Sequence, residues 1–94
     1  MFEVKIQNDD EVLLSGRFDA SQQEKVDNAL SQINKSCIIN FNDLQYISSA
    51  GLGSLLKAHV RLNGLGYSIK LIKMNSHIRE VFKYSGLDKV FKIE

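Results

Sequence analysis

The chain has no proline, no tryptophan and a single cysteine, Cys37. One cysteine excludes an internal disulfide bond and a cysteine-based zinc cluster, and it is typical of a reducing compartment. Because there is no proline and no stretch rich in serine and glycine, the 94 residues show no interdomain linker. We therefore expect one domain over residues 1–94, which is enough chain for a single hydrophobic core.

Long apolar runs and a dominant charge are also missing. The longest apolar runs have three residues, at 12–14 and 37–39, whereas a membrane-spanning helix needs about twenty and a signal peptide about seven. The 12 basic and 11 acidic residues leave a net charge of +1, which provides no broad field for nucleic acid or an anionic membrane. We expect a cytoplasmic protein that neither binds nucleic acid nor inserts into a membrane.

The hydrophobic periodicity predicts strands and helices in the order β-β-α-β-α-β-α-β. Strands are expected at 2–6, 11–15, 37–41, 68–71 and 90–93, with a turn at 8–10 and a connection at 42–47. Gly16 is expected to end the second strand, and Ser21 and Glu24 match a capping box for the first helix. The second helix follows Ser49. Asn75 or Ser76 caps the third helix, and Gly86 stands just past its end.

This order indicates an α/β fold, a sandwich of a mixed sheet and about three helices, with the first strand antiparallel. The run 37–41 is apolar until its end, which suits a central strand that is covered on both faces. If all three helices lie on one side of so short a chain, the other face is partly exposed instead.

Residue types that suit chemistry or docking concentrate in the segment 43–56, between the central strand and the second helix. Ser48 and Ser49 stand where that helix begins, and the free amides and macrodipole of a helix start favour a negative group there. Gly51 and Gly53 would let a phosphate or another backbone approach closely. Serine is also a common helix N-cap, so a purely structural role for either serine is an alternative.

Enzymatic interpretations of the sequence lack support. A dinucleotide fingerprint at Gly51 fails because its third glycine position holds Leu56 and no acidic residue follows at the required spacing. Cys37 opens an apolar strand, where we expect a buried and unreactive thiol. His59 and His77 have no clustered acids or thiols, so no metal site is expected. We therefore predict a protein that is not an enzyme and uses no cofactor.

Three elements of the sequence resemble a known family. Residues 43–53, Asp-Leu-x-x-Ile-Ser-Ser-Ala-Gly-Leu-Gly, resemble the signature of the STAS domain of bacterial anti-sigma factor antagonists. Residues 16–20 resemble the Gly-x-x-Asp element between its second strand and first helix, and residues 85–87 resemble its closing Ser-Gly-Leu pattern. The resemblance covers nearly the whole chain and implies a single STAS domain.

The resemblance implies a phosphorylation switch. In the family, a serine at this helix start is phosphorylated by a partner that is both an anti-sigma factor and a serine protein kinase. The unphosphorylated form binds that partner and so releases a sigma factor, and a serine phosphatase resets the switch. The acceptor position falls on Ser49. Many members have Asp-Ser-Ser-Gly where this chain has Ser48-Ser49-Ala50-Gly51, so Ser48 is a competing hydroxyl.

The partner is expected to contact the neighbours of the acceptor. These neighbours are Asp19, Ser48, Ala50, Gly51, Leu52 and Gly53. Asp19 matches an acidic position near the acceptor in the family, although a turn or helix-start residue would look the same. Gly51 is expected to serve docking more than folding. The alternative function is a STAS-like accessory subunit of a lipid transport ATPase, which would dock through the same helix without being phosphorylated.

Overall fold

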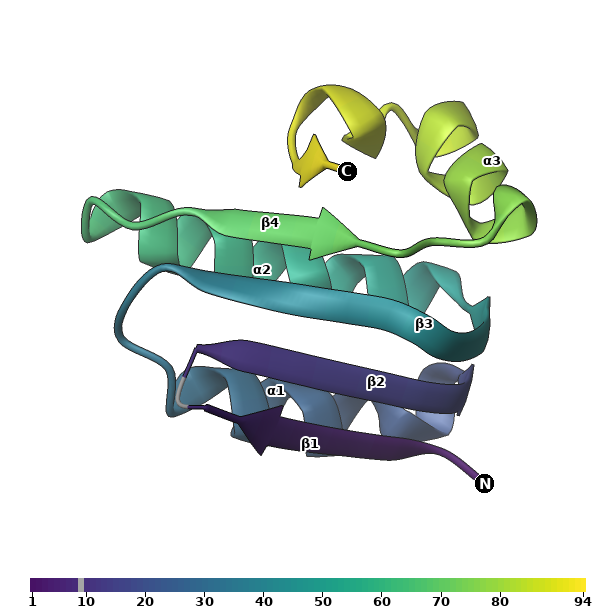
Figure 1. The fold of residues 1–94 in the computed structure, drawn as a ribbon, viewed down its shortest axis with the longest axis horizontal. Helices are drawn as coiled ribbons and strands as arrows, with labels where there is room; N and C mark the ends of the chain where they lie inside the picture. The colour runs from purple at the N-terminus through teal and green to yellow at the C-terminus, as the bar shows by residue number, and fades with distance from the viewer. Residues whose placement is uncertain (9) are drawn as a thin grey trace.

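The computed structural model describes residues 1–8 and 10–94 and contains one five-stranded sheet (Figure 1). The strands lie in chain order across the sheet: β1 (Glu3–Gln7), β2 (Glu11–Phe18), β3 (Cys37–Ile47), β4 (Ile69–Ile72) and β5 (Lys92–Ile93). β1 pairs antiparallel with β2, and every other neighbouring pair is parallel. The predicted architecture is therefore confirmed. Asp9, in the predicted first turn, lies outside the described residues.

Helices cover one face of this sheet. They are α1 (Gln23–Ser31), α2 (Ser49–Gly64) and α3 (Ser76–Ser85), with short 3-10 turns η1 (Ala20–Gln22) and η2 (Leu87–Lys89). In Figure 1, α1 and α2 lie behind the sheet and α3 lies past β4, on the side of the sheet where β5 forms the edge, while the face turned to the viewer carries no helix of the described chain. The expectation that residues 37–41 are covered on both faces is thus wrong. No helix of the described residues is long and apolar enough to cross a bilayer.

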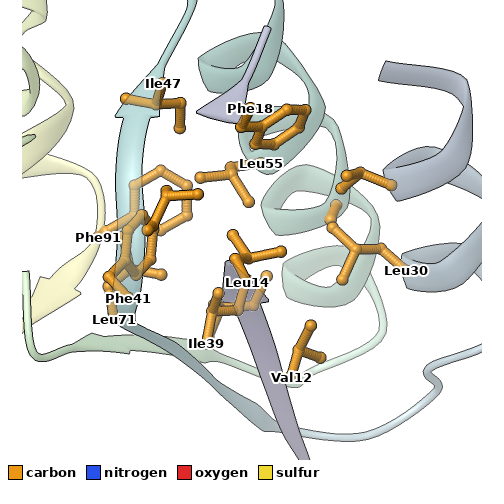
Figure 2. Packing of buried hydrophobic residues seen from close by; sticks show 14 of the residues in the cluster. Val12, Leu14, Phe18, Leu30, Ile39, Phe41, Ile47, Leu55, Leu71 and Phe91 are labelled. Atoms are coloured by element: carbon orange, nitrogen blue, oxygen red, sulfur yellow. The ribbon is translucent and has the colours of Figure 1, made fainter. Parts of the chain in front are cut away.

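The hydrophobic core fills the space between the helix-facing side of the sheet and the helices, as Figure 2 shows. Its central side chains come from β2, β3, β4, α1 and α2, and they include Val12, Leu14, Phe18, Ile39, Phe41, Leu71, Leu30 and Leu55. α3 and the C-terminal segment join the same core through rings, because Phe82 packs edge-on against Phe41 at 5.9 Å and against Phe91 at 6.0 Å between centroids. One continuous core therefore anchors every helix.

The predicted closing strand begins at Lys92 and not at residue 90, because Val90 is the C-cap of η2. The predicted ends of the second and third strands are also wrong, both for a single reason. β2 runs through Gly16 to Phe18, and β3 continues through residues 42–47 as a strand. Gly16 has φ +87° and lies against the Met1 carbonyl, where a Cβ would overlap the carbonyl oxygen. The β2–β3 register shifts on both sides of Gly16, so bulges keep the two strands paired beyond it. The extended pairing carries both strands to a common end.

The predicted capping box at Ser21 and Glu24 is wrong as well. The carboxylate of Asp19 instead accepts hydrogen bonds from the Ser21 amide, at 3.0 Å, and from its hydroxyl. Asp19 thereby caps η1, and α1 begins at Gln23 without a side-chain cap. The earlier acidic residue thus takes the capping role because it directly follows the end of β2.

Candidate functional site at the start of α2

The candidate site lies where β2 and β3 end side by side. Parallel strands place their carboxyl ends at the same edge of a sheet, and Phe18 pairs with Ile47 at this edge. The Ser48 amide donates to the Phe18 carbonyl at 2.9 Å, which extends the pairing by one more residue. Asp19 after β2 and Ser49 after β3 are therefore brought to the same edge from positions thirty residues apart in the sequence.

Ser48 is the N-cap of α2. Its backbone is extended, and its Oγ accepts a hydrogen bond from the Gly51 amide at 3.1 Å. Its carbonyl accepts from the Leu52 amide at 3.0 Å. Such a cap contributes about 0.5–2 kcal/mol to stability. The N-cap role considered for this serine is confirmed, because its hydroxyl oxygen accepts a hydrogen bond from the first turn of the helix.

Ser49 is the first residue of α2 and is exposed to solvent. Its hydroxyl makes no hydrogen bond with any other residue of the described chain. The amides of Ser49 and Ala50 lie in the first turn, where a helix has no internal acceptor for them. The first turn of α2 itself contains no acidic residue, so a negative group on Ser49 would meet the positive end of the macrodipole.

Gly51 is buried beneath the first turn. A Cβ at this position would lie 2.8 Å from Cγ1 of Ile47 and 3.1 Å from the ring of Phe18. Phe18 is itself completely buried, so its ring has little room to move. This geometry corrects the expectation that Gly51 serves docking more than folding, because its missing side chain allows α2 to pack on the sheet.

The rest of the predicted docking residues form a small, uncharged surface around Ser49. Gly53 is exposed, and a Cβ there would meet nothing within 4 Å. Ala50 and Leu52 are half-buried, with Leu52 packed partly against the core. The structure therefore brings Ser49, Ala50, Leu52 and Gly53 together on one surface patch, which we call the α2 patch.

The basic side chains of α2, Lys57 and Arg61, contact α1 and the turn that follows it. The Lys57 ammonium lies 3.8 Å from the Asp27 carboxylate. The Arg61 guanidinium donates to two carbonyls at the C-terminal end of α1, at 2.8 and 2.7 Å. Cations at that position are favourable because they oppose the negative end of the α1 dipole. These residues therefore tie the two helices together.

One feature of the site edge cannot be read from local sequence patterns. Arg17 pairs with Tyr46 in the β2–β3 register, and its guanidinium carbon lies 4.3 Å from the centroid of the Tyr46 ring. Such a cation–π contact contributes about 0.5–1 kcal/mol at an exposed site. It places one fixed positive charge at the carboxyl edge of the sheet. Only the long-range register, which depends on the bulges beside Gly16, creates this pair.

The single cysteine lies outside the site. Cys37 is buried, and burial, together with the nearby charge of Asp10, raises the pKa of its thiol to about 11, although Arg61 acts in the opposite direction. Because only the thiolate is a good nucleophile, this thiol is unreactive at neutral pH. The expectation of a buried and inert cysteine is confirmed.

Comparison with known proteins connects this geometry to a family. A family model described as "Mlab, STAS domain" matches residues 3–93. The "Putative anti-sigma factor antagonist BtrV" of Bordetella bronchiseptica is 30% identical over 84 residues, which cover 85% of this chain and 72% of that protein.

Solved structures show the same fold. The crystal structure of TM1081 from Thermotoga maritima has a TM-score of 0.78 at 22% identity and covers 98% of this chain and 84% of its own. The unphosphorylated anti-sigma factor antagonist SpoIIAA of Bacillus has a TM-score of 0.73 at 24% identity, with 100% and 88% covered. SpoIIAA has also been solved in its phosphorylated form, with a TM-score of 0.65 at 23% identity and 100% and 91% covered. The family model spans nearly the whole chain, and the curated relative supports it, so this chain belongs to the STAS domain family of anti-sigma factor antagonists.

Proposed function

We propose that this chain is an anti-sigma factor antagonist that is switched by phosphorylation of Ser49. The unphosphorylated form binds a cytoplasmic anti-sigma factor that is also a serine protein kinase, and this binding releases a sigma factor. The kinase then transfers phosphate to Ser49 and ends the complex, and a serine phosphatase restores the unmodified form. The chain is a substrate and a binding protein in this cycle, not an enzyme.

The observation that carries this proposal is the difference between the two adjacent serines. Ser48 uses its hydroxyl oxygen to cap α2, at 3.1 Å from the Gly51 amide, whereas Ser49 is exposed. A kinase can therefore reach the Ser49 hydroxyl without opening the helix. Its Oγ would attack the γ-phosphorus of ATP and form a new O–P bond. The bond to the β,γ-bridging oxygen would break, ADP would leave, and the hydroxyl proton would pass to a base on the kinase.

The α2 patch explains how the phosphate would end binding. A phosphoserine adds roughly −1.5 to −2 charges at neutral pH. The free amides at the start of α2 stabilise that charge within this chain. A partner that fits the small, uncharged surface of Ala50, Leu52 and Gly53 has to desolvate the phosphate instead. A loss of about 2–3 kcal/mol would weaken binding roughly 30- to 150-fold, which suffices for a switch.

Mass-spectrometric mapping after incubation with the cognate kinase and ATP tests the acceptor. We expect phosphate on Ser49 in the unmodified sequence and none in the Ser49→Ala variant. Ser48→Asn is the matched control, because asparagine removes the hydroxyl and retains an N-cap. Phosphate on Ser48 alone, or loss of labelling in Ser48→Asn with retention in Ser49→Ala, would contradict the assignment.

Calorimetry against the same partner tests the switch. Ser49→Ala should bind about as tightly as the unmodified chain, and the phosphorylated chain should bind roughly thirtyfold more weakly or worse, as the free-energy loss given above requires. Equal affinities of the phosphorylated and unmodified chains would overturn the mechanism. That result, together with no labelling by any serine kinase, would favour the alternative of an accessory subunit for a lipid transport ATPase, which needs the α2 surface but no acceptor.

A further inference from the structure

The sheet face without helices carries an ordered pattern of side chains. Strand pairing aligns residues across the sheet, and alternate residues along each strand point to this face. The first row across it reads Gln7, Glu11, Ile38, Lys70 and Lys92. The second row reads Lys5, Leu13, Asn40, Ile72 and Glu94, in which Glu94 directly follows β5 and its carboxylate lies 3.3 Å from the Lys70 ammonium.

We infer that this face binds the same face of a second copy of the chain, about a two-fold axis that runs along β3. Such an axis reverses the order of each row, so β1 of one copy faces β5 of the other and β2 faces β4. In the first row, Glu11 then lies opposite Lys70 of the second copy, and Ile38 lies opposite its own equivalent. An acidic residue thus meets a basic one on each side of an apolar centre.

The second row is complementary under the same rotation. Lys5 lies opposite Glu94 of the second copy, and Leu13 lies opposite Ile72. Because Lys70 and Glu94 already contact each other at 3.3 Å, the facing charges join them into a chain of four alternating charges on each side of the axis. Networks of this kind contribute more than isolated surface pairs.

The pattern also selects this orientation over the other two-fold arrangement. An axis across the strands would bring each strand over its own equivalent and exchange the two rows. Glu11 would then face Leu13, and Lys70 would face Ile72. Glu11 and Lys70 would then be desolvated against apolar side chains of the second copy that cannot pair with them, which is costly. The axis across the strands would match charge with charge only between Lys92 and Glu94, whereas the axis along β3 pairs Glu11 with Lys70, Lys5 with Glu94 and Leu13 with Ile72.

The centre of the face can be covered without leaving a buried polar group unpaired. Asn40 is 8% exposed. Its Nδ2 donates to the Glu11 carboxylate at 3.0 Å, and its Oδ1 accepts from the Asn42 amide at 2.8 Å. Around it, Leu13, Ile38 and Ile72 remain half-buried in the single chain. The second copy would therefore complete the burial of these apolar side chains.

The size of the face predicts a weak dimer. Five strands spaced about 4.8 Å apart give a width of roughly 24 Å. With a strand length of about 17 Å, each copy offers roughly 400 Å². Both copies together bury less than the roughly 1,200–2,000 Å² of stable interfaces, so we expect a Kd between about 10 μM and 1 mM. α2 lies on the other side of the sheet, so the dimer would leave Ser49 accessible on both copies.

Sedimentation equilibrium of the chain from about 10 μM to 1 mM provides the first test. We expect a reversible dimer that the Ile38→Glu variant weakens at least tenfold, because this variant places two carboxylates together at the axis. The matched control is Val60→Glu, whose side chain is 63% exposed on α2, and it should dimerise like the parent. Circular dichroism would verify that both variants are folded. A chain that stays monomeric to 1 mM, or that dimerises equally well with Ile38→Glu, would overturn the inference.

A mixing experiment tests the proposed axis itself. Lys5→Glu and Glu94→Lys each bring like charges together, so each variant alone should dimerise roughly fivefold more weakly than the parent. In a mixed dimer, the new carboxylate at position 5 of one variant faces the new ammonium at position 94 of the other. The unchanged Lys5 and Glu94 also face each other, so the mixed dimer should form more tightly than the dimer of either variant alone, although Glu94→Lys loses its contact with Lys70. If mixing restores nothing while the parent dimerises, the axis along β3 is wrong.

The dimer and the phosphorylation switch can fail separately. Neither the sedimentation experiment nor the mixing experiment depends on a kinase or on phosphorylation of Ser49. A monomeric chain that is still phosphorylated on Ser49 would overturn the dimer alone, and a dimer without an acceptor would leave the inference intact.

Discussion

The first turn of α2 has an inner and an outer side that are built from the same residue types. On the inner side, Ser48 caps the helix and Gly51 packs against Phe18, with no room for a Cβ. On the outer side, Ser49 is exposed and Gly53 faces open space. The Ser-Ser-Ala-Gly-Leu-Gly motif therefore combines residues that pack α2 on the sheet with residues that are exposed to solvent. Residue identity alone does not distinguish the two sides, but substitutions should.

The largest effect is expected for Gly51→Ala. Alanine is a better helix former than glycine by up to about 1 kcal/mol. The new Cβ, however, would lie 2.8 Å from Ile47 Cγ1 and 3.1 Å from the buried Phe18 ring, and overpacking of this kind typically costs about 1–3 kcal/mol. We expect a net loss of about 1–2 kcal/mol in the free energy of unfolding, measured by chemical denaturation. Unchanged stability would show that the first turn has room to shift away from the sheet.

Ser48→Ala should have the next largest effect. It removes the hydroxyl that accepts from the Gly51 amide at 3.1 Å. The loss of a serine cap costs about 1 kcal/mol, which lowers the Tm of a domain of this size by roughly 4–8 °C. Ser48→Asn should retain most of the stability, because asparagine caps helices as well as serine does. If both variants melt at the parental temperature, the Ser48 hydroxyl is not needed for capping.

Gly53→Ala is expected to raise the stability that Gly51→Ala lowers. Nothing lies within 4 Å of a Cβ at this position, so only the gain in helix propensity remains. We expect stability to rise by about 0.5–1 kcal/mol. The same methyl group would project from the α2 patch, so partner affinity measured by calorimetry should fall. A drop in stability would place Gly53 on the inner side of the turn and break the comparison.

The ends of the helices can be predicted from sequence because they depend on residues that are close together in the chain. The local pattern places Ser48 and Ser49 at the start of the second helix. It also places Asn75 at the start of the third helix and Gly86 just past its end. Asn75 accepts from the Ile78 amide at 2.8 Å, and Gly86 has a φ of 80°. Caps of this kind involve residues three or four apart, so a local pattern is sufficient.

Long-range pairing explains what the sequence does not reveal. Local pattern makes Gly16 the end of a strand, but its close approach to Met1 and the neighbouring bulges continue the β2–β3 pairing to Ile47. The inner role of Gly51 likewise depends on Phe18, which is distant in sequence. Such contacts are set by tertiary packing rather than by propensity. The strand order is predictable because consecutive elements tend to be neighbours.

Ser49→Asp is expected to change stability least and function most. The carboxylate would lie at the first position of α2, where a negative charge favourably meets the macrodipole by about 0.3–1 kcal/mol, near the lower limit for an exposed side chain. We expect a gain of about 0.3–0.5 kcal/mol at low salt that shrinks in 1 M salt, where the Debye length falls to about 3 Å. Ser49→Asn is the neutral control and should show no salt-dependent gain.

Stability and partner binding, both measured on Ser49→Asp, distinguish a role of Ser49 in binding from a role in folding. Calorimetry should show weaker partner binding for Ser49→Asp than for Ser49→Asn. The effect should be smaller than that of true phosphorylation, because one carboxylate carries less charge than a phosphate. A stability loss above about 1 kcal/mol would resemble removal of a cap, and would place Ser49 on the inner side of the turn with Ser48. Weaker binding at unchanged or higher stability can arise only if the side chain of Ser49 faces the partner and contributes nothing to the packing of α2.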